Sequence, residues 1–97
     1  MILESAYLDV RPGSETDFES AFRTASPLIS ATPGYHGHEL HRCLEHPHRY
    51  LLLVRWETLE AHTVEFRGSD RYQEWKRLLH HFYDPFPTVL HFTSIRP

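Results

Sequence analysis

A histidine in the second half of the chain is placed where it could transfer protons. His62 lies three residues after Leu59 and four before Phe66, so in a helix the three side chains share one inward-facing stripe. An imidazole titrates close to neutral pH and can accept a proton from a bound ligand. The alternative is a core histidine whose ring nitrogens bond to the backbone or to a neighbouring side chain, and the spacing alone favours this second interpretation.

Aromatic residues near His62 could form the walls of a cavity for a flat ligand, because stacked rings bury large areas with defined geometry. The candidate ligand-contacting residues are Trp56, Phe66, Tyr72, Tyr7 and His91. Tyr7 and His91 lie in terminal segments that are read as strands, and their parity does not settle which way they point. For Trp75 we favour plain core packing. Arg67 could pair with an anionic ligand oxygen, but we favour a role in solvating the end of a helix.

The nine histidines also raise the question of a metal site. His36 and His38 are two residues apart, a spacing that places both on one face of a strand, where they could chelate zinc or copper. The segment from His38 to His41 is one residue shorter than the helical zinc-protease motif, and on a strand these two histidines point to opposite faces. Surface histidines are the favoured interpretation, so we assign no metal ligands, and the His36–His38 pair stays open.

The pattern of apolar residues predicts four strands and three helices in the order β-α-β-β-α-α-β. The strands are expected over residues 2–10, 35–43, 49–56 and 88–95. The helices are expected to follow Ser14, Thr58 and Ser69, each of which can cap a helix N-terminus. Pro27 lies inside the first helical pattern and should kink or restart that helix. This order is typical of an α+β ferredoxin-like sandwich, a four-stranded antiparallel sheet with the helices on one face.

The third predicted strand indicates how the chain assembles. Residues 50–54, Tyr-Leu-Leu-Leu-Val, are apolar on both parities, so both faces of this strand need to be covered. One layer of helices covers only one face of a sheet. A second copy of the chain is the simplest cover for the other face, so we expect a homodimer in which sheet packs against sheet.

Length and composition limit the other classes of function. The 97 residues suffice for one domain, 1–97. Ten basic and thirteen acidic residues give a net charge of −3, which offers no electrostatic basis for binding nucleic acid. No apolar run reaches the roughly 18 residues that span a membrane. The N-terminal segment lacks the positive charge of a signal peptide, and Cys43 has no second cysteine to pair with. We therefore expect a soluble, cytoplasmic protein that binds neither nucleic acid nor membrane.

The segment Trp56-Glu57-Thr58-Leu59-Glu60-Ala61-His62, followed by Phe66, Ser69 and Tyr72, resembles the antibiotic biosynthesis monooxygenase domain. In that family a strand ending in Trp-Glu leads to a helix with an Ala-His pair, and then to a helix that begins at a serine. The Pro33-Gly34-Tyr35 turn and the element order also match, so the resemblance covers nearly the whole chain.

The resemblance implies a dimeric α+β barrel. Some members of the family oxidise aromatic phenols or quinols with molecular oxygen and use no metal or flavin. His62 would then take the proton of a small phenolic ligand, and the anion would react directly with O2, which would be the co-substrate. The resemblance adds weight to this catalytic interpretation of His62, so both interpretations stay open.

Two other functions need to be weighed within the same fold. Haem-degrading members use an asparagine on the first strand and an iron-binding histidine on the helix that matches residues 69–82. This chain has no asparagine, and the ligand position falls near Trp75 or Lys76, so haem degradation is disfavoured. The remaining alternative to an oxygenase is a non-catalytic dimer that binds a small ligand or a partner in the same cavity.

Overall fold

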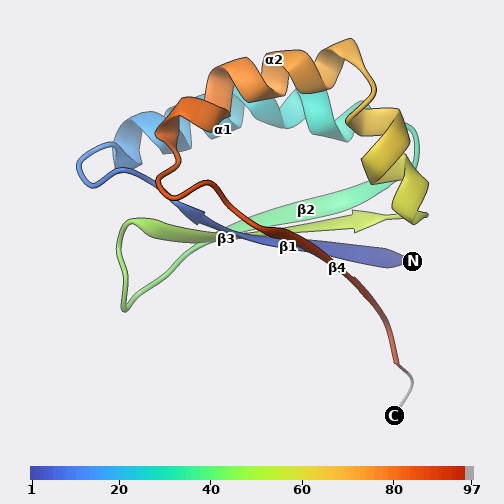
Figure 1. Ribbon diagram of the computed structural model, residues 1–97, viewed down its shortest axis with the longest axis horizontal. Coiled ribbons are helices and arrows are strands. Elements are labelled where there is room, and N and C mark those ends of the chain that lie inside the picture. Colours follow the sequence, from blue (N-terminus) through green and yellow to red (C-terminus); the bar gives the residue numbers. More distant parts are fainter. Residues whose placement is uncertain (96–97) are drawn as a thin grey trace.

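The computed structural model describes residues 1–95, which form a four-stranded antiparallel sheet with the helices packed on one face (Figure 1). The strands are β1 (Ile2–Asp9), β2 (Tyr35–Arg42), β3 (Arg49–Trp56) and β4 (Val89–Thr93), in the sheet order β2-β3-β1-β4. The helical segments are α1 (Glu15–Ser30), η1 (Ala61–Phe66), α2 (Asp70–Leu79) and η2 (His80–Phe82). The predicted ferredoxin-like α+β fold is confirmed.

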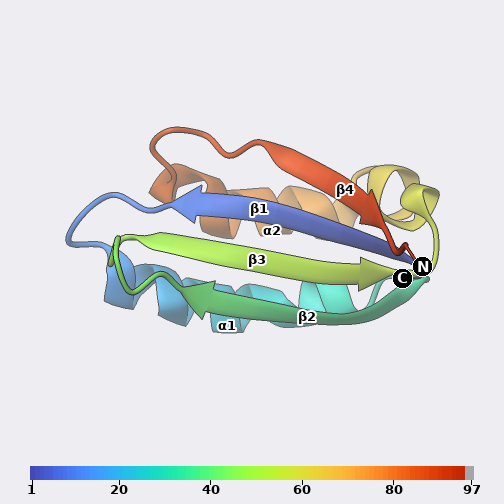
Figure 2. The same ribbon diagram turned by 90° about the horizontal axis from the view of Figure 1, so that it is seen from below.

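The central strand β3 has two different faces. Its even-numbered residues are buried beneath the helices: Tyr50, Leu52, Val54 and Trp56. Ala6 and Leu8 of β1 pair with Leu52 and Tyr50 and extend the same buried face. The other face carries no helix among residues 1–95 (Figure 2). We call this second surface the open face, and its apolar residues are Leu3, Tyr7, Leu51, Leu53, Leu90 and Phe92.

Two of the three predicted helix caps form as expected. The Oγ1 of Thr58 accepts a hydrogen bond from the Ala61 N–H at 3.1 Å, and the Oγ of Ser69 accepts one from the Tyr72 N–H at 3.3 Å. Ser14 occupies the N-cap position of α1, but its side chain makes no capping hydrogen bond. Side-chain oxygens therefore hold the starts of the two helical segments that flank the site.

The limits of several elements differ from the prediction, and β1 and β2 each end one residue earlier than expected. Helix α1 continues through Pro27 to Ser30, so the predicted restart is wrong. Pro27 lies in the last turn, where its missing N–H removes only one helical hydrogen bond. Strand β4 ends at Thr93 rather than at residue 95, because Thr93 pairs with Ile2, the first residue of β1.

No helix within residues 1–95 is long and apolar enough to cross a membrane.

The segment after Thr58 is wound more widely than an α-helix. η1 is a π-helix, and the Arg67 N–H donates to the His62 carbonyl five residues earlier at 3.1 Å. The predicted inward stripe forms only in part. His62 and Phe66 are buried as predicted, whereas Leu59 is 41% exposed and does not belong to the inward stripe.

Gly34 allows the chain entering β2 to pass close to η1. Its φ is +87°, and a Cβ atom at this position would lie 2.6 Å from the Cβ of Ala61. Gly34→Ala should therefore combine backbone strain with overpacking and lower the free energy of unfolding by about 2–4 kcal/mol, measured by urea denaturation. Gly13→Ala is the matched control, because Gly13 has a φ of +92° but no atom within 4 Å of that position. Equal losses in the two variants would contradict the predicted clash.

Candidate functional site

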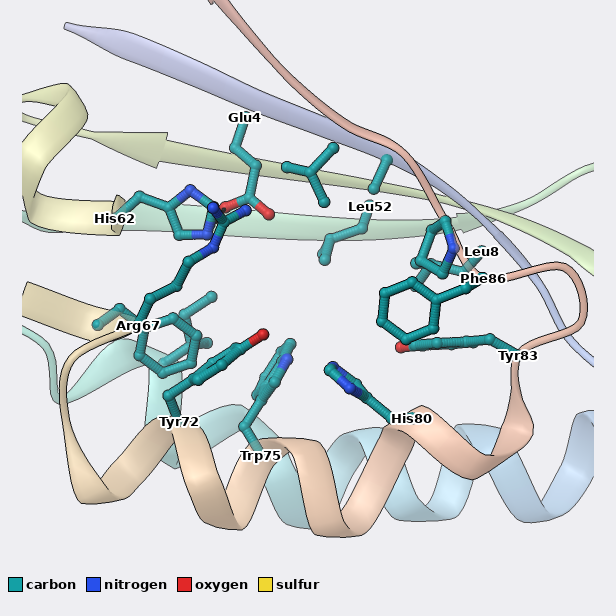
Figure 3. Close-up of a pocket in the computed structure, with 15 residues that line it drawn as sticks. Glu4, Leu8, Leu52, His62, Arg67, Tyr72, Trp75, His80, Tyr83 and Phe86 are labelled. Carbon is teal, nitrogen blue, oxygen red and sulfur yellow. Dashed lines mark ion pairs between the residues drawn. The ribbon is translucent and has the colours of Figure 1, made fainter. Parts of the chain in front are cut away.

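A cavity of about 370 Å³ lies between the helices and the sheet (Figure 3). This volume is within the range of small-ligand sites. β1 and β3 provide its apolar wall on the sheet side, and η1, α2 and the segment after η2 provide most of the remaining lining. The aromatic lining residues are Phe66, Tyr72, Trp75, Tyr83 and Phe86. The cavity thus has the shape and chemistry to enclose a flat, largely apolar ligand.

A row of buried polar side chains borders one end of the cavity. The indole N–H of Trp56 donates to Oε1 of Glu4 at 2.9 Å, and Nε2 of His62 lies 3.4 Å from the same oxygen. On the other side of the ring, His62 Nδ1 is 2.7 Å from Nε2 of His91. Glu4 and His62 are only 5% and 4% exposed. Both nitrogens of His62 therefore have side-chain partners.

These contacts indicate which nitrogen of His62 carries the proton. Burial, with contributions from Arg67 and His91, lowers the pKa of His62 to about 3, so the ring is neutral at pH 7. Oε1 of Glu4 is an acceptor, because Trp56 can only donate to it. We therefore assign the ring proton to His62 Nε2, the nitrogen that faces this acceptor at 3.4 Å. His62 Nδ1 is then unprotonated and accepts from the Nε2–H of His91.

Glu4 is the group in this row that is best suited to take a proton from a ligand. Burial raises the pKa of its carboxyl above the usual 4.5, although the Trp56 N–H and the nearby Arg67 act in the opposite direction. A carboxylate whose pKa is raised toward neutrality can both accept and return a proton. The guanidinium of Arg67 lies beside Glu4 and His62 in Figure 3 and lines the cavity, where it could hold an anionic oxygen. Arg67 is also the C-cap residue of η1 and is exposed, so it borders both the cavity and the helix end.

The structure brings most of the predicted site residues together. Phe66 and Tyr72 line the cavity beside His62. Trp56 stacks on the His62 ring, with ring centroids 5.3 Å apart and planes inclined by 16°, so it supports that ring from behind and does not line the cavity. His91 reaches His62 from β4, on the helix-covered side of the sheet.

Tyr7 does not belong to this site. It is 60% exposed and lies on the open face, whereas its neighbours Ala6 and Leu8 line the cavity from the other side of β1. Successive side chains of a strand point to opposite faces, so Tyr7 cannot reach the cavity of its own chain. Its predicted role as a ligand contact within this cavity is wrong.

The possible metal pair does not form a ligand cluster. His38 contacts Tyr35 and Ser26, whereas His36 lies 4.0 Å from a carboxylate oxygen of Glu57. The register of β2 shifts between Tyr35 and Gly37, so the regular alternation expected for this strand is interrupted at His36. Residues 1–95 contain no group of three or more histidine, cysteine, aspartate or glutamate side chains that could hold a metal ion.

Four polar or aromatic residues that line the cavity were not among the predicted contacts: Glu4, His80, Tyr83 and Phe86. Glu4 had a usable signal, because it shares the parity of Ala6 and Leu8 and is thus an acidic residue in an apolar row. The other three lie in or after η2, where the helical period ends. Trp75 is buried as expected of a core residue, yet it also lines the cavity.

Comparison with known proteins places this chain in a family. The model of the antibiotic biosynthesis monooxygenase family matches residues 1–78. The protein YczJ of Bacillus subtilis strain 168, which is uncharacterized, is 58% identical over 95 residues. That match covers 98% of this chain and 100% of YczJ.

Solved structures agree with this assignment. A Bordetella bronchiseptica protein assigned to the same family is 42% identical, with a TM-score of 0.92 over 98% of this chain and 97% of that one. SnoaB, a cofactor-independent oxygenase from Streptomyces nogalater, shares the fold at 18% identity, with a TM-score of 0.85 over 99% and 94% of the two chains. On the family match and the close relatives together, the chain belongs to the antibiotic biosynthesis monooxygenase family.

Proposed function

We propose that this protein is a cofactor-independent monooxygenase that oxidises a small aromatic phenol or quinol with O2 in the cavity of Figure 3. One observation carries the proposal: an aromatic-walled cavity contains a buried carboxyl–histidine pair, Glu4 and His62, with Arg67 beside it. Family membership supports the reaction class, and a protein of the same fold, SnoaB, is named as a cofactor-independent oxygenase.

The pair would act first on the hydroxyl group of the ligand. Because His62 Nε2 already carries a proton, the Glu4 carboxylate takes the phenolic proton. The Trp56 N–H hydrogen bond holds this carboxylate in place beside His62. Arg67 stabilises the negative charge that develops on the ligand oxygen. The proton acceptor in this proposal is thus Glu4 rather than His62, which the sequence predicted, and His62 acts beside Glu4 at the cavity wall.

The electron-rich anion would then reduce O2 without an external reductant. In a phenol whose keto tautomer has a ring CH2 group, oxidation of CH2 to C=O supplies four electrons, which reduce O2 completely. One oxygen atom enters the new carbonyl group, and the other leaves as water with the two hydrogens of the CH2 group. The proton held by Glu4 returns to the departing oxygen, so the carboxylate is regenerated.

Oxygen uptake tests this proposal directly. A panel of anthrones and quinols is assayed with a Clark electrode, with and without EDTA, and uptake that survives the chelator is expected. His62→Ala should lower the rate by about 10²-fold or more, the usual effect of removing part of an acid–base pair. Unchanged turnover of an accepted phenol by His62→Ala would remove His62 from the mechanism.

One observation favours a second candidate function, a non-catalytic protein that binds a small ligand. Both ring nitrogens of His62 are occupied by Glu4 and His91, as in a histidine that only stabilises a fold. Saturable binding of the same aromatic compounds without any oxygen uptake would support this alternative and contradict the oxygenase.

We also propose that the protein is a homodimer formed through the open face. Tyr7, Leu90 and Phe92 are exposed there, and Leu51 and Leu53 of β3, on the other side of β1 from β4, are only partly covered. A contiguous apolar sheet face of this kind is typical of an interaction surface. A second copy presents the same residues and can cover them by packing sheet against sheet.

A further inference from the structure

Three hydrogen-bond donors on the α2 side of the cavity have no protein acceptor within residues 1–95. They are the indole N–H of Trp75 and the hydroxyl groups of Tyr72 and Tyr83, and all three point into the cavity in Figure 3. Trp75 is 6% exposed and Tyr83 is 7% exposed, so both side chains are almost entirely withdrawn from bulk water. In Figure 3, Tyr72 and Trp75 extend from α2 toward the cavity, and Tyr83 lies beneath Phe86 at the end away from His62.

Buried donors without partners indicate what a ligand must offer. Leaving a buried donor unsatisfied costs about 1–3 kcal/mol, so such groups normally bind protein, water or a ligand. In the described part of the chain, Nε of Arg71 is the only fully buried side-chain nitrogen or oxygen without a hydrogen-bond partner. The donor atoms of Trp75 and Tyr83 are therefore not fully buried, and they are accessible from the cavity that both residues line. An indole N–H can only donate. The ligand atom opposite Trp75 must therefore be an acceptor.

The local charges favour a neutral acceptor over an anionic one. Burial, with a smaller contribution from Lys76, lowers the pKa of His80, so this lining residue is neutral at pH 7. Burial and the nearby Glu4 raise the pKa of Tyr83, so its hydroxyl stays protonated and able to donate. Arg67, the arginine that lines the cavity, lies beside Glu4 instead. A carboxylate at the α2 side would lose its hydration without gaining an adjacent cation from the lining residues.

We propose that Trp75 and Tyr83 form a subsite for a neutral carbonyl oxygen of the substrate, with Tyr72 as a third donor. The inference rests on the proposed function for the placement of the ionisable hydroxyl at the Glu4 end. Together the two ends select a flat aromatic ketone or quinone that carries a hydroxyl group on the opposite edge. A ligand without a carbonyl leaves two buried donors unpaired and binds more weakly.

A matched pair of ligands tests the subsite without requiring turnover. 1-Hydroxyanthraquinone and 1-anthrol share three fused rings and one hydroxyl group, but only the first has carbonyl oxygens. Their dissociation constants are measured anaerobically by quenching of tryptophan fluorescence, with calorimetry as the second method. We expect wild-type protein to bind 1-hydroxyanthraquinone about 10-fold or more tightly than 1-anthrol, as one or two added hydrogen bonds predict. Equal affinities, or no binding of either compound at its solubility limit, would overturn the subsite.

Variants then assign the preference to the two residues. Trp75→Phe and Tyr83→Phe remove the donors and keep an aromatic ring, so each should weaken binding of 1-hydroxyanthraquinone about 10-fold and of 1-anthrol less than 2-fold. Tyr50→Phe is the matched control, because the Tyr50 hydroxyl is buried outside this cavity and donates to Glu19 at 2.6 Å. Parallel losses for both ligands would indicate packing rather than recognition and would overturn the assignment. Because the wild-type ligand preference needs no substitution, the proposal stays testable even if a variant does not fold.

The outcome is separable from that of the oxygenase proposal. A carbonyl preference without oxygen uptake would retain the subsite and contradict the proposed reaction. Oxygen uptake with simple phenols and no carbonyl preference would retain the reaction and overturn the subsite.

Discussion

Glu4→Gln is expected to lower kcat/KM for a phenolic substrate by about 10²–10⁴-fold, the range typical of losing a general base. The amide side chain has nearly the same size, and its oxygen can still accept the hydrogen bond that Trp56 Nε1–H donates to Glu4. The fold should therefore be retained, as a thermal melt can verify. What the variant lacks is the carboxylate that takes the proton of the ligand, and initial rates of oxygen uptake measure that loss.

The pH profile distinguishes a base from a carboxyl group that only stabilises the fold. Burial raises the pKa of Glu4 above 4.5, and the group can act as a base only when it is ionised. The wild-type rate should therefore rise with pH through this raised pKa, and the Glu4→Gln rate should be flat over the same range. Glu57→Gln changes an exposed carboxyl group outside the cavity and should keep the wild-type profile. A normal rising limb in Glu4→Gln would assign the titration to another group and contradict the role of Glu4.

The fold could be predicted from the sequence because its elements have regular periods and clear ends. Buried and less buried side chains alternate along β3, with Tyr50, Leu52 and Val54 buried, as the two-residue period of a strand requires. Prolines and glycines mark the turns. The π-helix was not predictable in this way. Its i+5 hydrogen bonds depart from the α-helical period that the sequence suggested, and Leu59, which precedes η1, is exposed although its spacing from His62 is that of an α-helical neighbour.

The site was predictable only where its residues lie on periodic elements. His62 and Phe66 could be found because their helical spacing relates them to each other, and Tyr72 because it shares a face of the next helix with Trp75. The contact between His62 and His91 joins residues 29 positions apart, and only the pairing of β4 with β1 brings them together. Tyr83 was not found because it follows η2, where no period relates it to α2. Long-range pairing and irregular segments thus determine the polar half of the site.

Leu51→Asp is expected to convert the proposed dimer into a monomer at micromolar concentration. Leu51 lies on the open face, where its cross-strand neighbours are Tyr7 on β1 and His41 on β2. A two-fold dimer would bury two copies of the new carboxylate between apolar sheets. Burying an unpaired charge costs several kcal/mol, so the dimer dissociation constant should rise by about 10³-fold or more. Light scattering after gel filtration and sedimentation equilibrium measure the mass and the constant.

Leu51 is already partly exposed in the single chain, so the substitution should change assembly without unfolding the protein. Circular dichroism should accordingly show a folded monomer. Val64→Asp is the matched control, because Val64 is 58% exposed on η1, away from the open face, and should leave the dimer intact. A wild-type mass of one chain at micromolar concentration would contradict the dimer itself. Dissociation by both substitutions would show that the interface is not confined to the open face, because only Leu51 belongs to that surface.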